Sequence, residues 1–137
     1  MLPEDTLRVI DSNVLVRFLV NDSPLKSVKI KRMLSARTKK FLLTDVTVAE
    51  VVWVLSSYYK FPKKQIVGKI LSLLDLPCLE VNSSLLTTAL LTYSQNSIDY
   101  VDAYLAAYCL DKGFAGVVSY DRDLSKVAGV RRFEPAA

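Results

Sequence analysis

The sequence predicts an α/β protein, a three-layer α/β/α sandwich around a central, mainly parallel sheet of about five strands. Short apolar segments alternate with segments of helical periodicity, a pattern that places helices on both faces of a parallel sheet. The 137 residues are 51% apolar and 23% charged, which suits a globular chain with a substantial core. Because the chain has no repeat, linker or low-complexity stretch, we expect residues 1–137 to form one domain.

Each element follows from apolar spacing and from the residues that end it. The predicted strands are apolar runs at 7–10, 41–44, 78–81, 116–119 and 130–133. The predicted helices cover about 14–20, 24–34, 47–59, 63–74, 84–93 and 98–112, and a short helical turn follows residue 121. Gly113 is expected to close the last long helix, and Leu25, Val28 and Leu34 are expected on the buried face of the second.

Composition excludes several kinds of chemistry. The chain has no histidine, so His-based triads, zinc hydrolases and haem ligation have no candidate. Its four glycines form neither a dinucleotide-binding motif nor a P-loop. Cys78 and Cys109 lie in apolar stretches and are expected to be buried free thiols. An enzyme of this composition would depend on Asp and Glu, and carboxylates without imidazole favour hard metal ions.

The sequence shows no signal for the membrane. No apolar run approaches the ~20 residues that a bilayer-spanning helix needs. The first residues lack the basic and apolar segments of a signal peptide. We therefore expect a cytoplasmic protein with no membrane partner.

Two aspartates directly follow predicted strands. Asp11 follows the first strand and Asp121 the fourth, and ligands of open α/β sheets bind at the carboxyl ends of strands. Each could instead be a helix N-cap or a turn residue, which is the commoner role of a single aspartate at such a position.

Glu50 is the one charge in an otherwise apolar helical run. Its neighbours on the helical wheel include Val46 and Trp53, which predicts a face that is not solvated. The alternative is a capping box in which Glu50 accepts a hydrogen bond from the Thr47 amide. The sequence leaves both interpretations open.

Asp102 lies in the middle of a predicted apolar stripe. Ile98, Leu105 and Cys109 fall near it around the helix axis. A carboxylate on a buried face needs a cation, a hydrogen-bond network or a metal ion, because unpaired burial costs several kcal/mol. Asp99, one turn earlier, is explained by its position at the helix N-terminus.

Together these acids predict a metal centre. If the first and fourth strands are neighbours, Asp11 and Asp121 meet at one end of the sheet, and Glu50 and Asp102 can point into the same notch. Such a cluster repels itself unless cations neutralise it. Carboxylate-bound Mg²⁺ or Mn²⁺ would do so, activate a water and stabilise a phosphodiester transition state.

Four segments resemble the PIN domain family, and specifically the VapC-type toxin ribonucleases of toxin–antitoxin pairs. The segments are 9–15 (VIDSNVL), 48–52 (VAEVV), 99–107 (DYVDAYLAA) and 118–124 (VSYDRDL). They occur in order and with family-like spacing, and the resemblance extends from Leu7 to about Phe133. It implies a PIN-like fold and a metal-dependent endoribonuclease.

The resemblance also implies roles for individual residues. The ligands of one or two Mg²⁺ or Mn²⁺ ions would be Asp11, Glu50, Asp102 and Asp121. Ser12 and Asn13 match the family's signature of an aspartate followed by serine or threonine and then asparagine. Ser12 would support the first acid or the ion, whereas Asn13 could equally be a helix N-cap. Asp99 is an alternative to Asp102 as a metal ligand, and Asp123 is an alternative to Asp121. We prefer Asp102 because of its place in the stripe and because it precedes an alanine, as in the family.

Charge and aromatic residues suggest partners. The net charge of +4 suits a nucleic acid, and Lys29, Lys31 and Arg32 on the second helix could contact an RNA backbone, although a solvated helix face is the simpler explanation for any one of them. Part of the aromatic cluster over 53–61 is expected to be exposed, with core packing as the default for Trp53. The resemblance implies homodimerisation and a cognate antitoxin. The alternative function is a non-catalytic RNA-binding or antitoxin-binding module of the same fold.

Overall fold

The structure is a computed structural model that describes residues 7–21, 24–36 and 39–136. The chain divides into two compact units, Met1–Asn82 and Ser83–Ala137. In both units every strand pairing is parallel, and helices connect the strands. The prediction of an α/β protein with a parallel sheet is therefore confirmed.

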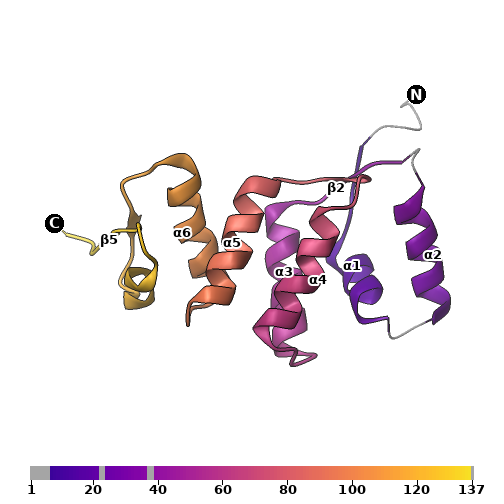
Figure 1. The fold of residues 1–137 in the computed structure, drawn as a ribbon, viewed down its shortest axis with the longest axis horizontal. Helices are drawn as coiled ribbons and strands as arrows, with labels where there is room; N and C mark the ends of the chain where they lie inside the picture. Colours follow the sequence, from indigo (N-terminus) through magenta and orange to yellow (C-terminus); the bar gives the residue numbers. More distant parts are fainter. Residues whose placement is uncertain (1–6, 22–23, 37–38, 137) are drawn as a thin grey trace. The chain divides into compact units, whose positions relative to one another are not determined.

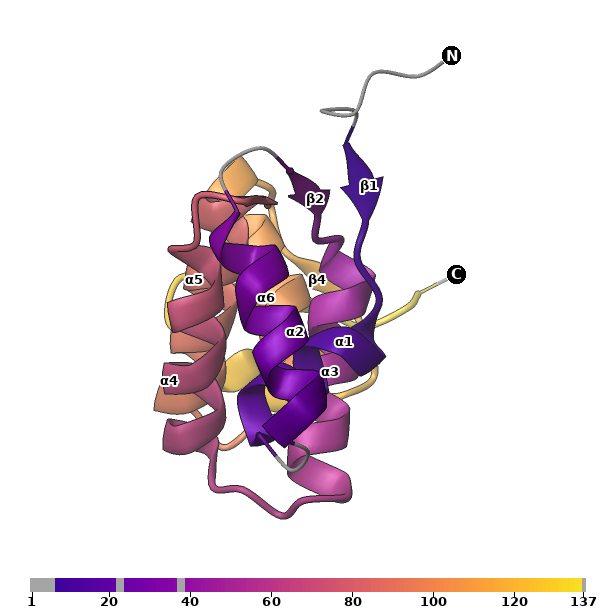
Figure 2. The same cartoon turned by 90° about the vertical axis from the view of Figure 1, so that its right-hand side faces the viewer.

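The first unit holds a three-stranded parallel sheet in the order β1-β2-β3. Its strands are β1 (Arg8–Val9), β2 (Phe41–Leu42) and β3 (Leu79–Glu80), and its helices are α1 (Ser12–Val20), α2 (Pro24–Ser35), α3 (Asp45–Ser57) and α4 (Lys63–Leu74). Helix α1 packs against α2 and α3, and α3 packs against α4 (Figures 1 and 2). The fully buried side chains of this unit are aliphatic, among them Leu15, Leu43, Leu55, Ile66 and Ile70.

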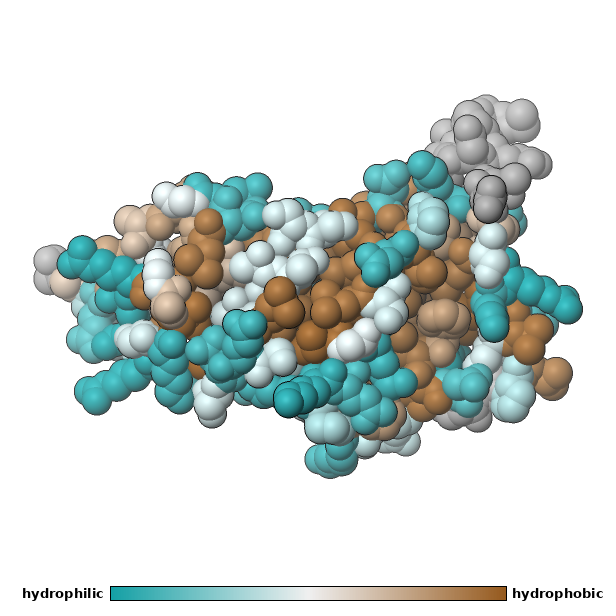
Figure 3. Space-filling model, in the orientation of Figure 1, coloured by the Kyte–Doolittle hydropathy of each residue, from teal (hydrophilic) through white to brown (hydrophobic). Residues whose placement is uncertain are grey.

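Helix α2 buries less than its sequence suggests. Leu34 is buried as expected, but Leu25 is 82% exposed and Val28 is 49% exposed, so their predicted inward position is wrong. The reason is that α2 packs on α1, which is short, and a narrow contact covers only one side of a helix. Figure 3 shows hydrophilic and hydrophobic surface side by side over the part of the molecule where Figure 1 labels α2.

The second unit pairs two helices and two strands. Helices α5 (Ser83–Gln95) and α6 (Tyr100–Lys112) pack against each other, and β4 (Val117–Val118) pairs in parallel with β5 (Arg132–Phe133). The short 3-10 helix η1 (Arg122–Lys126) connects the two strands.

Two glycines of this unit are needed where they stand. Gly113 closes α6 in the left-handed conformation with φ 68°, as predicted. Gly116 lies so close to the Arg131 carbonyl that a Cβ could not fit. The segments before β4 and β5 can therefore lie this close together only because Gly116 has no side chain.

The other sequence predictions for the fold have mixed outcomes. All six predicted helices are present, and both cysteines are buried and free. Helix α3 begins at Asp45 rather than Thr47, because the Thr44 hydroxyl accepts a hydrogen bond from the Thr47 amide and so caps the helix earlier. No helix among the described residues has the length and apolar character that crossing a bilayer requires.

Candidate metal centre

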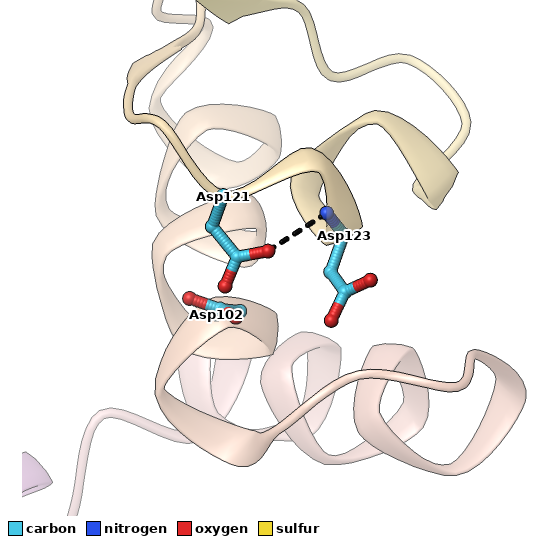
Figure 4. Close-up of side chains that lie close together, drawn as sticks. All are labelled: Asp102, Asp121 and Asp123. Atoms are coloured by element: carbon cyan, nitrogen blue, oxygen red, sulfur yellow. Dashed lines mark hydrogen bonds between the residues drawn. The ribbon is translucent and has the colours of Figure 1, made fainter.

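Three aspartates of the second unit bring their carboxylates together (Figure 4). Asp102 lies in the first turn of α6, whereas Asp121 and Asp123 lie at the start of η1, just after β4. One carboxylate oxygen from each residue lies within 4.8 Å of the other two. Asp102 and Asp123 are half-buried and Asp121 is exposed, so the cluster has a side open to solvent.

The turn after β4 positions Asp121 and Asp123. Asp121 is the N-cap of η1, and its Oδ1 accepts a hydrogen bond of 2.9 Å from the Asp123 amide. The Asp121 amide itself donates to Ser119 Oγ at 2.9 Å. A side-chain cap satisfies an amide that the helix start would leave without a partner. The cap thus holds both carboxylates on the side of the turn that faces Asp102 (Figure 4).

A lysine contacts the same cluster. Lys126 Nζ lies 2.8 Å from Asp123 Oδ1 and also donates to the Ser97 carbonyl at 3.2 Å. The ion pair therefore neutralises one of the three carboxylates, and the other two remain to repel each other. Sequence reasoning missed Lys126, although its spacing of three residues from Asp123 is the spacing at which charges on a helical turn meet.

The cluster changes the acidity of Asp102. Its pKa is raised from 3.8 to about 6, first by desolvation, then by its hydrogen bond with Asp121 and by repulsion from Asp121, Asp99 and Asp123. Every one of these causes favours the protonated form, so the fold holds a carboxylate where a negative charge is costly. A bound cation would reverse this effect, because an opposite charge favours the ionised acid.

The residues of the cluster fit a hard divalent cation. Mg²⁺ and Mn²⁺ prefer carboxylate oxygens and keep some bound water, which the open side of the cluster allows. One oxygen from each of the three aspartates lies within 4.8 Å of the other two, which is near enough for the three carboxylates to hold one such cation together.

The first unit contains a second acidic arrangement, built around Ser12. Asp11 is the N-cap of α1 and accepts hydrogen bonds from the Ser12 amide at 2.8 Å and from Asn13 Nδ2 at 3.3 Å. Ser12, which is 2% exposed, donates its hydroxyl to Glu50 Oε1 at 2.7 Å. Ser12 therefore links the acid after β1 to the acid of α3.

These contacts decide two alternatives that the sequence left open. Glu50 is not part of a capping box, because the Thr47 amide donates to Thr44 and the Glu50 carboxylate accepts from Ser12 instead. Asn13 is not the N-cap of α1, since Asp11 occupies that position.

The environment of Glu50 also differs from the expectation. Glu50 is exposed, and the neighbouring Val46 and Trp53 are 75% and 66% exposed, so the prediction of an unsolvated face is wrong, as is the default of a buried Trp53. The buried residues of α3 are Val48, Val51, Val52 and Leu55, which lie on the other side of the helix from Trp53, and the side of Trp53 stays open.

Each predicted site residue can now be placed. In the second unit Asp102, Asp121 and Asp123 form the cluster, so both candidate ligands after β4 lie in it. Asp99 is the exposed N-cap of α6, outside the cluster but near enough to raise the pKa of Asp102. The residues of the first unit are linked among themselves, and the predicted convergence of acids from both units stays a prediction.

The acids after β1 and β4 lie beyond the carboxyl ends of parallel strands, where open α/β proteins bind their ligands. Comparison with known families matches residues 8–130 to the PIN domain family, so the chain belongs to that family. The comparison with curated proteins gives no match. Family membership supports a nuclease activity, and the cluster of three aspartates provides carboxylates that could serve it.

Proposed function

We propose that this protein is a metal-dependent endoribonuclease, the VapC-type toxin of a toxin–antitoxin pair, which acts in the cytoplasm. The observation that carries the proposal is the cluster of Asp102, Asp121 and Asp123 in a member of the PIN domain family. Their oxygens are the ligands that Mg²⁺ or Mn²⁺ would take, as one ion or two.

The chain's own residues would divide the work. Asp102, Asp121 and Asp123 would hold the cation, while Asp11 and Glu50 contribute further carboxylates to the same reaction. Ser12 orients both acids of the first unit through its amide and its hydroxyl. A bound divalent ion would supply an activated water and charge stabilisation for the phosphodiester.

The test of this proposal uses total RNA. Purified protein incubated with RNA and Mn²⁺ should produce fragments with defined ends, whereas the same reaction in chelator should produce none. Mapping the ends by sequencing identifies the cleaved bonds. RNA that stays intact with Mn²⁺ present would contradict the nuclease assignment.

One observation favours a second candidate function. Lys126 already pairs with Asp123 at 2.8 Å, as a structural carboxylate would be paired in a protein that needs no metal. The second candidate is a non-catalytic RNA-binding or antitoxin-binding module of the same fold. RNA that is bound but not cleaved in either reaction would select this candidate.

We also propose partners for the exposed aromatic surface at the end of α3, defined by Trp53, Tyr58, Tyr59 and Phe61. Trp53 and Tyr58 are 66% and 75% exposed, and Tyr59 packs on both Tyr58 and Phe61. Exposed aromatic side chains in a group are typical of protein interfaces. The proposed occupant is the antitoxin, and the protein itself is proposed to form a homodimer.

Trp53→Ala should then weaken the complex with the product of the neighbouring reading frame by about 30-fold, the effect of losing an interface tryptophan worth about 2 kcal/mol. Leu25→Ala, at a side chain that is 82% exposed on α2, is the control and should leave affinity unchanged. Sedimentation of the mixture measures the affinity of the complex. Sedimentation of the protein alone shows whether it forms a homodimer. If co-expression neither protects cells nor yields a complex, the toxin assignment loses its support.

A further inference from the structure

A groove lies between α1 and α2, wholly within the first unit. Its volume is about 220 Å³. The two helices pack against each other and lie side by side at the right of Figure 1 and at the front of Figure 2. The groove is lined by Asn13, Val14, Arg17, Lys26, Lys29 and Ile30.

The charge of this groove is of one sign. Arg17, Lys26 and Lys29 are all exposed, and no acid lines the groove among the residues that the structure describes. None of the three cations takes part in an ion pair within the described ranges, where the pairs involve other lysines and arginines. Three cations around one concavity, with no ion pair among the described residues, raise the local concentration of anions.

The lining of the groove is mainly apolar. Val14 and Ile30, which are half-buried, line it together with the longer side chains. An isolated inorganic anion would gain nothing from such a lining. A nucleotide chain would use both features, since its phosphates can meet the cations while a ribose or base face covers the aliphatic side chains.

The groove is also connected to the acids of the first unit. Asn13 lines the groove and donates a hydrogen bond of 3.3 Å to Asp11 Oδ2. A chain bound in the groove would thus pass within one side chain of Asp11. Lys31 and Arg32, which the sequence groups with Lys29, do not line this groove, and Lys31 lines a separate one with Phe18 and Val28.

We propose that the α1–α2 groove binds the sugar-phosphate backbone of single-stranded RNA, with Arg17, Lys26 and Lys29 each meeting a phosphate. This inference rests on the proposed function, because it assigns the path of the substrate beside Asp11. It adds Arg17 of α1 to the basic residues that the sequence predicts on the second helix, and it separates Lys29 from Lys31.

Binding as a function of salt tests the groove without any cleavage. The probe is a fluorescent single-stranded RNA oligomer in chelator, bound to wild type and to the triple variant Arg17→Gln, Lys26→Gln, Lys29→Gln. Loss of three phosphate contacts should make the slope of log affinity against log salt shallower by about 2. Wild type should therefore lose about 20-fold more affinity than the variant when salt rises fourfold.

The matched control carries the same change in net charge outside the groove. It is the triple variant Lys39→Gln, Lys60→Gln, Lys64→Gln, at exposed lysines of the same unit. Its salt slope should stay close to that of wild type. If the salt slope falls equally in the two triple variants, RNA is attracted by the overall charge of the protein and the groove is not its binding site. If the slope is unchanged in the groove variant, the proposal is wrong and an acidic peptide is the better occupant of the groove.

The inference and the proposed function can fail separately. If the groove variant has a shallower salt slope but wild type never cleaves RNA in Mn²⁺, RNA binding in the groove is supported and the nuclease assignment is wrong. If wild type cleaves RNA and the groove variant binds as the control does, the groove falls alone. Should the triple variant not fold, as judged by circular dichroism, the single substitution Lys29→Glu at an exposed position replaces it with the same criteria.

Discussion

Asp102→Asn is expected to abolish Mn²⁺-dependent RNA cleavage, with a loss of about 100-fold or more. Changes to groups that merely support a metal ligand already cost about 10- to 100-fold, and Asp102 is proposed as a ligand itself. Asparagine keeps the size of the side chain but removes the negative charge that would hold the cation. Initial rates of oligonucleotide cleavage measure the effect, and circular dichroism checks the fold.

The matched control is Asp75→Asn. Asp75 is an exposed residue at the C-terminal end of α4, outside both acidic arrangements, and its variant should cleave at the wild-type rate. Asp11→Asn should lose activity as Asp102→Asn does, because both acids are proposed to serve one reaction. Wild-type rates in a folded Asp102→Asn protein would remove Asp102 from the site.

The second large effect concerns stability. In chelator, Asp102→Asn should melt at a higher temperature than wild type, because the substitution removes a charge from a half-buried cluster in which desolvation and repulsion disfavour it. Proteins often keep such a destabilising group where function needs it. Thermal melts followed by circular dichroism give the comparison.

With Mn²⁺ present, wild type should melt at a higher temperature than Asp102→Asn, the reverse of the order in chelator. At a hundredfold excess over its dissociation constant, a ligand that binds only the folded state stabilises it by about 2.7 kcal/mol, so wild type should gain that amount. Asp102→Asn should gain much less. If Asp102 were a structural residue, asparagine would destabilise the protein in chelator, and Mn²⁺ would shift both melting temperatures equally.

The same melts in chelator carry a pH signature. The pKa of Asp102 is about 6 in the folded protein, against 3.8 for an aspartate in an unfolded chain, so the folded state binds the proton more tightly. The resulting stabilisation is complete below pH 3.8 and is lost as pH rises through about 6. Wild type should therefore lose more stability than Asp102→Asn between pH 5 and pH 7.5, and parallel curves would contradict the raised pKa.

Local sequence determined most of the secondary structure. Apolar spacing, together with stop signals such as Gly113, predicted all six helices, because these signals act within a few residues of each other. The boundary of α3 was wrong for a similar local reason, since two threonines competed for the cap and Thr44 made the hydrogen bond. The acids after β1 and β4 were also identifiable from the chain alone.

Only the tertiary structure decided what those acids contact. The bond from Ser12 to Glu50 joins residues 38 positions apart, and the approach of Asp102 to Asp121 and Asp123 joins α6 to the turn after β4. Neither distance follows from periodicity, which describes one element at a time. Exposure was decided in the same way, because a helix face such as that of Trp53 is buried only if another element packs against it.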